Sequence, residues 1–147
     1  MCWTSNTKPE IKIATKNITV YKIGTKKFEF FRSYVIGYLY ERYDINPDIT
    51  LIPHEREFDD FVITQGYHSI ASKSKAEIAC KKYFYGGYLA EFIIPKGAKY
   101  CINDNEEIVS SNIIFIKYIN EESNIFKDII LKFKLLFWRN NLSYVLD

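Results

Sequence analysis

The stretch QGYHSIASKSKAE (65–77) sets how the middle of this chain passes from strand to helix. Gly66 permits a backbone turn that a β-branched residue would resist. Ser74 and Glu77 have the S-x-x-E spacing of a capping box, in which each side chain satisfies the other residue's backbone amide. Apolar residues then recur at helical spacing until a Gly-Gly pair ends the pattern. The stretch therefore predicts a strand, a turn and a helix over 74–84.

The same stretch holds the first candidate site. Side chains of neighbouring strand residues point to opposite faces, so Tyr67 is expected in the core and His68 on an accessible, concave surface. A helix N-terminus offers unpaired amides to an anion. Ser69, Ser72 and Ser74 would add hydroxyl donors for a phosphate or carboxylate. In the alternative interpretation, the serines only cap the helix and His68 satisfies a nearby carbonyl.

The rest of the chain shows mostly strand patterns. Segments rich in β-branched and aromatic residues lie at 17–24, 27–41, 88–95, 96–102 and 106–119, with a short strand or helical turn at 58–65. A loose N-terminal arm is expected over 1–16, with 1–10 the least ordered, and a loop or lid over 42–57. An amphipathic helix is expected over 121–141. The predicted fold class is α+β: a mostly antiparallel sheet, one short internal helix and the C-terminal helix. Residues 1–147 are expected to form one domain with its core in 17–119.

Composition favours a folded, β-rich protein. The chain has 147 residues, of which 48% are apolar, with 12 tyrosines and 11 phenylalanines. That length is sufficient for a core without disulfides. The net charge of +2 is too small to indicate specific nucleic-acid binding. The charge is distributed in alternating basic and acidic blocks, which fit solvated faces or, alternatively, a basic groove for a phosphate-bearing ligand.

Cysteine and histidine usage predicts neither zinc nor disulfides. Cys2, Cys80 and Cys101 are far apart and form no C-x-x-C pair. The two histidines, His54 and His68, lack metal-ligand spacing. The N-terminus has no apolar secretory segment and no stretch fits a membrane span, so we expect a cytoplasmic protein with reduced thiols. No common nucleotide-binding or hydrolase motif is present.

Four segments together resemble a family of small uncharacterised proteins from phages and gut Bacteroidales genomes. They are GYHS (66–69), IPKGAKY (94–100), EIVS (107–110) and VYK (20–22). The resemblance covers roughly 17–119. It implies an architecture and a phage context, but no activity.

The order of these segments is also similar to that of the ADP-ribosyltransferases. Those enzymes use an arginine or histidine on a first strand, a Ser-Thr-Ser motif or tyrosine in the middle, and a late glutamate. Lys22 stands at the first position, the SIAS segment from Ser69 to Ser72 at the second, and Glu107 at the third. The resemblance implies that Glu107 orients a ribose hydroxyl and that Ser69 or Tyr67 lines a nicotinamide pocket.

Three functions remain open from the sequence. The first is a non-enzymatic protein that binds a small phosphate-bearing ligand or nucleotide, acting on host signalling or defence, with no cofactor, metal ligand or catalytic residue. The second is a protein–protein interaction module or inhibitor, with the 121–141 helix mediating homo-oligomerisation. The third is an ADP-ribosyltransferase-like enzyme. The candidate ligand-binding residues are Tyr21, Lys22, Tyr67, His68, Ser69, Ser72 and Glu107.

Overall fold

The computed structural model shows a mostly antiparallel β-protein with one helix among the residues that it describes. These are residues 3–27, 30–34, 38–56, 60–83, 87–119 and 133. The helix is α1 (Lys73–Tyr83). The strands are β1 (Trp3–Ser5), β2 (Lys12–Ile13), β3 (Ile18–Lys27), β4 (Phe30–Ser33), β5 (Leu39–Glu41), β6 (His54–Glu55), β7 (Phe61–Ile63), β8 (Tyr67–Ile70), β9 (Tyr88–Ile94), β10 (Lys99–Ile102), β11 (Glu107–Ser110) and β12 (Ile114–Tyr118).

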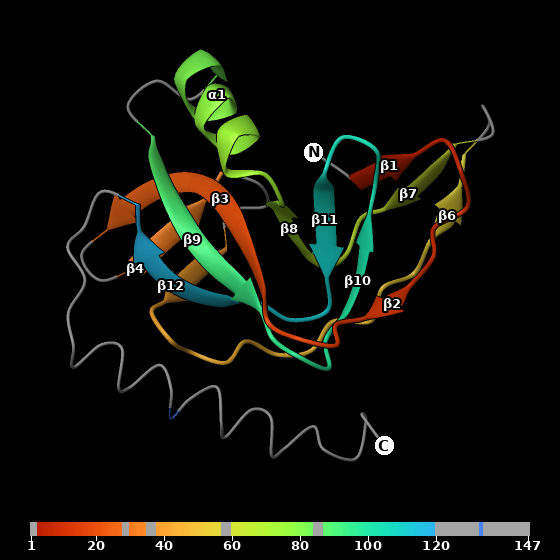
Figure 1. The fold of residues 1–147 in the computed structure, drawn as a ribbon, viewed down its shortest axis with the longest axis horizontal. Helices are drawn as coiled ribbons and strands as arrows, with labels where there is room; N and C mark the ends of the chain where they lie inside the picture. The colour runs from red at the N-terminus through yellow and green to blue at the C-terminus, as the bar shows by residue number, and fades with distance from the viewer. Residues whose placement is uncertain are drawn as a thin grey trace.

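These strands form two sheets, whose strand pairs are all antiparallel. The larger has the order β12-β9-β3-β8-β11-β10-β2, with β4 and β5 added beside β3. The smaller has the order β1-β7-β6. Figure 1 shows β12, β9 and β3 on one side and β8, β11 and β10 on the other, with α1 above the region where β3 and β8 meet.

The larger sheet forks at β3. One edge of β3 pairs with β9 along Ile18 to Gly24. The other edge meets β8 at a single pair, Tyr21 with Ile70, and then pairs with β4 from Gly24 onward. Because β8 and β4 leave the same edge in different directions, none of the described strands lies beside the short segment of β3 between them on that edge.

The main core is aromatic and lies against β3, β4, β9 and β12. Phe92, from the centre of β9, packs at ring-centroid distances of 5.3 Å from Phe31, 5.2 Å from Tyr40 and 5.2 Å from Phe115. Each of these four side chains is almost completely buried. A second cluster joins the smaller sheet to β10 and β11, and consists of Trp3, Leu51, Ile63, Cys101 and Val109.

The predicted internal helix is confirmed, but its cap is not the predicted one. The Ser72 hydroxyl accepts the Lys75 amide at 3.3 Å, so Ser72 is the N-cap. The predicted capping box of Ser74 and Glu77 is therefore wrong, because the N-cap lies two residues earlier. Ser74 instead hydrogen-bonds through its hydroxyl to Ser72, at 2.9 Å. Ser72 and Ser74 both lie at the start of the helix, and the earlier of the two caps it.

The α+β fold class with two helices is wrong for this protein. Within the described residues there is a single helix of 11 residues, and nearly everything else that is regular is strand. The expected helix over 121–141, with the oligomer contact assigned to it, lies outside the described residues apart from Phe133. No helix in the described part of the chain is long and apolar enough to cross a membrane.

Several segments also differ from the predictions in detail. The N-terminal arm is not loose at Trp3–Ser5, because this segment pairs with β7 and buries Trp3. The segment 27–41 contains strand structure, as predicted, in the form of β4 and β5, which pair with each other. The 42–57 loop contains the short strand β6. β3 does not end at Gly24, where a Cβ atom would lie 2.1 Å from the Arg32 carbonyl oxygen of β4. Glycine there allows the two strands to pair closely.

Candidate functional site

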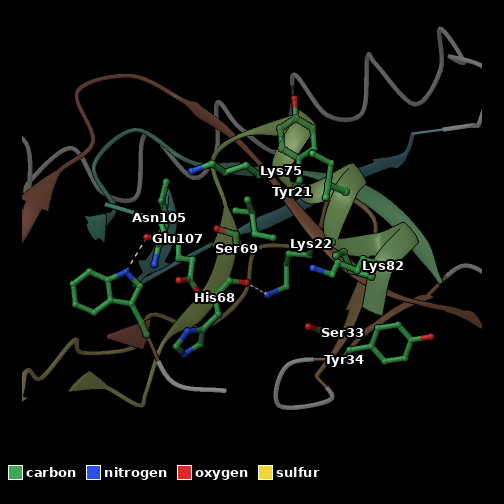
Figure 2. A pocket seen from close by; sticks show the side chains of 16 residues that line it. Tyr21, Lys22, Ser33, Tyr34, His68, Ser69, Lys75, Lys82, Asn105 and Glu107 are labelled. Carbon is green, nitrogen blue, oxygen red and sulfur yellow. Dashed lines mark hydrogen bonds between the residues drawn. The ribbon is translucent and has the colours of Figure 1, made fainter. Parts of the chain in front are cut away.

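A pocket of about 680 Å³ opens at the fork of the larger sheet. Its walls come from four parts of the fold (Figure 2). β3 and β8 contribute Tyr21, Lys22, Ile23, His68, Ser69 and Ile70; β11 and the turn before it contribute Asn105, Glu107 and Ile108; α1 contributes Lys75, Ile78, Ala79 and Lys82; and Trp3, Ser33 and Tyr34 complete the lining. The volume is typical of small-molecule sites.

Lys22 is a buried amine with no acidic partner among the described residues. Its side chain is 4% exposed, and its Nζ donates a hydrogen bond to the His68 carbonyl oxygen across the fork. The same nitrogen lies 5.4 Å from the Tyr40 ring centre and 5.8 Å from that of Phe92. Burial lowers the Lys22 pKa to about 7, because the charged form loses its hydration. Both protonation states are therefore populated near neutral pH.

Ser69 brings an unused hydroxyl group to the same pocket. The residue is 6% exposed, and its Oγ has no hydrogen-bond partner among the described residues. A buried hydroxyl without a partner costs free energy, so such a group is normally satisfied. A ligand with an amide, a hydroxyl or a phosphate oxygen would supply the missing partner.

Glu107 is held at three points at the start of β11. Its carbonyl accepts the Trp3 indole N–H at 2.8 Å, its amide donates to Asn103 Oδ1 at 3.0 Å, and its Oε1 accepts from Asn103 Nδ2 at 3.3 Å. The preceding residue, Glu106, has a φ of 61°, a conformation that non-glycine residues rarely adopt. Its carbonyl accepts the Ala71 amide at 2.8 Å, which ties this turn to the end of β8. Strained and well-fixed backbone of this kind clusters at functional sites.

His68 also lines the pocket and is neutral at physiological pH. Burial, and then the positive charge of Lys22, lower its pKa to about 4. Its Nε2 lies 3.4 Å from the Thr64 carbonyl oxygen. A neutral imidazole in this position can donate or accept a hydrogen bond but carries no charge to attract an anion.

The structure brings five of the seven predicted ligand-binding residues together in this pocket: Tyr21, Lys22, His68, Ser69 and Glu107. Tyr67 and Ser72 are not among the lining residues. Tyr67 lies in the core with its hydroxyl bonded to the Pro47 carbonyl at 2.7 Å, and Ser72 caps α1. His54 lies on β6 in the smaller sheet. No group of three or more His, Cys, Asp or Glu side chains among the described residues could hold a metal ion.

Sequence reasoning missed the contributions of Trp3, Asn105, Lys75 and Lys82. Lys75 and Lys82 are seven residues apart, a spacing that places both on one face of a helix, so a helical plot of α1 would have paired them. No local sequence pattern places Trp3 at the pocket, because its position depends on the pairing of β1 with β7.

Comparison with known proteins gives no relative: no protein-family model, no curated protein and no solved structure matches this chain. The resemblance to small phage and Bacteroidales proteins therefore stays a prediction. The site is interpreted from its own geometry.

Proposed function

We propose that this pocket binds NAD and that the protein is an ADP-ribosyltransferase-like enzyme. The observation that carries the proposal is the convergence of Lys22, Ser69 and Glu107 in one pocket. Lys22 lies on β3, Ser69 on β8 and Glu107 on β11, so the three residues are far apart in the sequence. They are the three positions that the sequence resemblance assigns to the first-strand, middle and glutamate positions of such enzymes.

The chemistry of NAD fits the charges in the pocket. Its nicotinamide carries a positive charge and leaves as a neutral molecule when the bond between its ring nitrogen and the ribose carbon breaks. Positive charge then develops on the ribose, where a carboxylate stabilises it. Glu107 is the described carboxylate that lines the pocket, and Trp3 and Asn103 fix its backbone. An acceptor hydroxyl, amine or water forms the new bond to the ribose carbon and releases its proton to a base. Glu107 lines the pocket and can act as that base.

The other end of NAD carries two phosphates, which require cations. Lys22 lies inside the pocket, and Lys75 and Lys82 of α1 line it (Figure 2). Lys75 is half-exposed and makes an ion pair with Glu106 at 3.3 Å, a contact weak enough for a phosphate to replace. The Ser69 hydroxyl, which has no hydrogen-bond partner within the described part of the chain, supplies a hydrogen bond for the nicotinamide amide.

A second candidate function, NAD binding without turnover, is favoured by three departures from the enzyme pattern. Lys22 replaces the first-strand arginine or histidine, and a lysine cannot make the bidentate phosphate contact of an arginine. Ile70 and Ala71 separate the two serines of the SIAS segment, and of these two only Ser69 lines the pocket, because Ser72 caps α1. Asn105 stands two residues before Glu107, where the family pattern has glutamate or glutamine. A protein with these changes would retain the pocket of a small-ligand binder.

One experiment separates the two functions. Nicotinamide release from NAD is measured by chromatography, and NAD affinity by calorimetry, for the wild type and Glu107→Gln. The enzyme function predicts that Glu107→Gln binds NAD but releases nicotinamide roughly 10²–10³-fold more slowly. Binding without release in both proteins supports the binder. Glu55→Gln is the control, because Glu55 is exposed on β6 and does not line the pocket. An absence of NAD binding in every protein would overturn both candidates.

A further inference from the structure

A second chemistry is available at Lys22 that does not depend on NAD. An amine attacks a carbonyl only when it is uncharged, so exposed lysines, with a usual pKa near 10, have roughly one reactive molecule in a thousand at neutral pH. Lysines become reactive when an apolar environment removes their charge. Lys22 has that environment: it is 4% exposed, two aromatic rings lie beside its nitrogen, and no described carboxylate pairs with it.

We propose that Lys22 forms a reversible imine with an aldehyde-bearing sugar phosphate bound in the pocket. The Nζ lone pair forms a bond to the aldehyde carbon, and the electron pair of the C=O double bond moves to oxygen. A proton passes from nitrogen to that oxygen, giving a carbinolamine. The C–O bond then breaks, the oxygen leaves as water with a second proton, and the nitrogen lone pair completes the C=N bond. Amine and aldehyde thus give imine and water, and no oxidant or reductant is required.

The surroundings of Lys22 support each part of this step. A neutral amine has two N–H bonds and one lone pair, so it can keep its hydrogen bond to the His68 carbonyl and still present the lone pair. The buried Ser69 hydroxyl has no partner among the described residues, so it is available to hydrogen-bond the carbonyl oxygen. Lys75 and Lys82 line the pocket and supply positive charge for a phosphate. A phosphorylated aldose combines the two groups that this lining recognises.

The alternative role of Lys22 is structural. Its ammonium bridges β3 to β8 through the His68 carbonyl, at the point where the two strands part. A lysine with that role would hold the fork together but would react no faster than an exposed lysine. The rate of reaction with an aldehyde therefore distinguishes the two roles.

Reductive trapping tests the proposal on the full chain. The protein is incubated at pH 7 with ribose 5-phosphate and cyanoborohydride, and modified lysines are located by peptide mass spectrometry. We expect Lys22 to be labelled at least about tenfold faster than the exposed Lys16, because burial beside two aromatic rings favours the uncharged amine. Lys22→Arg should abolish this fast labelling, whereas Lys16→Arg should leave it unchanged. With ribose, which lacks the phosphate, the ratio of Lys22 labelling to Lys16 labelling should fall.

Labelling of Lys22 no faster than Lys16 would overturn the proposal. Because Lys22 is buried, circular dichroism checks that the Lys22→Arg variant is folded. If that variant unfolds, the comparison of Lys22 with Lys16 in the wild-type protein still decides the question. Nicotinamide release is measured on the same sample of wild type. Fast labelling of Lys22 without NAD binding or cleavage would support the imine proposal and overturn the proposed NAD function. NAD binding and cleavage without fast labelling of Lys22 would support the NAD function and overturn the imine proposal.

Discussion

The indole Nε1 of Trp3 donates a hydrogen bond of 2.8 Å to the backbone carbonyl of Glu107, joining residues 104 positions apart in the chain. Trp3 is 2% exposed and also packs in the second core cluster. The contact links the N-terminal strand directly to the residue proposed to be catalytic. If Glu107 is catalytic as proposed, we expect Trp3 to position it.

Trp3→Phe should separate this positioning role from packing. A phenyl ring stays, but the Glu107 carbonyl keeps only one of its two donors, the Asn103 amide at 3.1 Å, so the free energy of unfolding should fall by about 1 kcal/mol. Nicotinamide release should slow more than NAD affinity weakens, because a shift of the carboxylate affects the reaction more than binding. Trp3→Ala should lower the free energy of unfolding by about 3–5 kcal/mol, because it also leaves a cavity in the second core cluster. Equal loss of binding and turnover in Trp3→Phe would show that Trp3 only supports the fold.

Gly66 should tolerate no side chain. Its φ is 124°, and a Cβ atom there would lie 2.6 Å from Val109 Cγ2 and 2.8 Å from Leu51 Cδ2. Gly66→Ala should therefore lower the free energy of unfolding by at least about 1–3 kcal/mol, the usual cost of a strained backbone conformation. Urea unfolding measures the change. An alanine variant as stable as the wild type would show that the turn before β8 does not need glycine.

Lys22 should make stability depend on pH in the alkaline range. Its pKa is about 7 in the folded chain, against an ordinary value of 10.5 in the unfolded chain. Between these values the unfolded chain binds more protons, so the free energy of unfolding rises as pH rises from 7 to about 10. Below pH 7 the full cost of burying the charge is present. The shift corresponds to a change on the order of 4–5 kcal/mol across this range.

Lys22→Met should flatten this pH dependence, because methionine fills similar space without a titrating group. Urea unfolding at intervals from pH 6.5 to 10 measures the slope. Lys16→Met is the matched control, because Lys16 is exposed and should leave the wild-type slope unchanged. The same slope in Lys22→Met as in the wild type would show that Lys22 does not titrate near pH 7.

The sequence predicted the local parts of this site but not how they meet. Lys22 and Glu107 were expected on strands, because alternation and β-branched composition are local signals. Ser69 was expected in the turn after a strand ending at His68, whereas it lies on β8. The fork that brings the three residues together depends on which strands share an edge of β3, and this pairing is made between distant segments. Trp3 was assigned to a loose arm for the same reason, since three strand residues without alternation carry no pattern of their own. The helix cap is Ser72 and not the predicted Ser74, because both serines lie at the helix start and have the same intrinsic capping ability.

The alternation of Tyr67 and His68 gives the most direct test of the strand before α1. Tyr67 is 5% exposed and packs against Tyr40 at 6.2 Å, whereas His68 lines the pocket. Tyr67→Ala should cost roughly 3–5 kcal/mol of stability, and Tyr67→Phe about 1 kcal/mol, because it loses only the hydrogen bond to Pro47. His68→Ala should leave the melting temperature at pH 7 nearly unchanged but weaken NAD binding. Thermal unfolding and calorimetry on the three variants measure both effects. The opposite pattern, a harmless Tyr67→Ala and an unfolded His68→Ala, would mean that the two side chains point to the reverse faces and that the pocket is not the binding site.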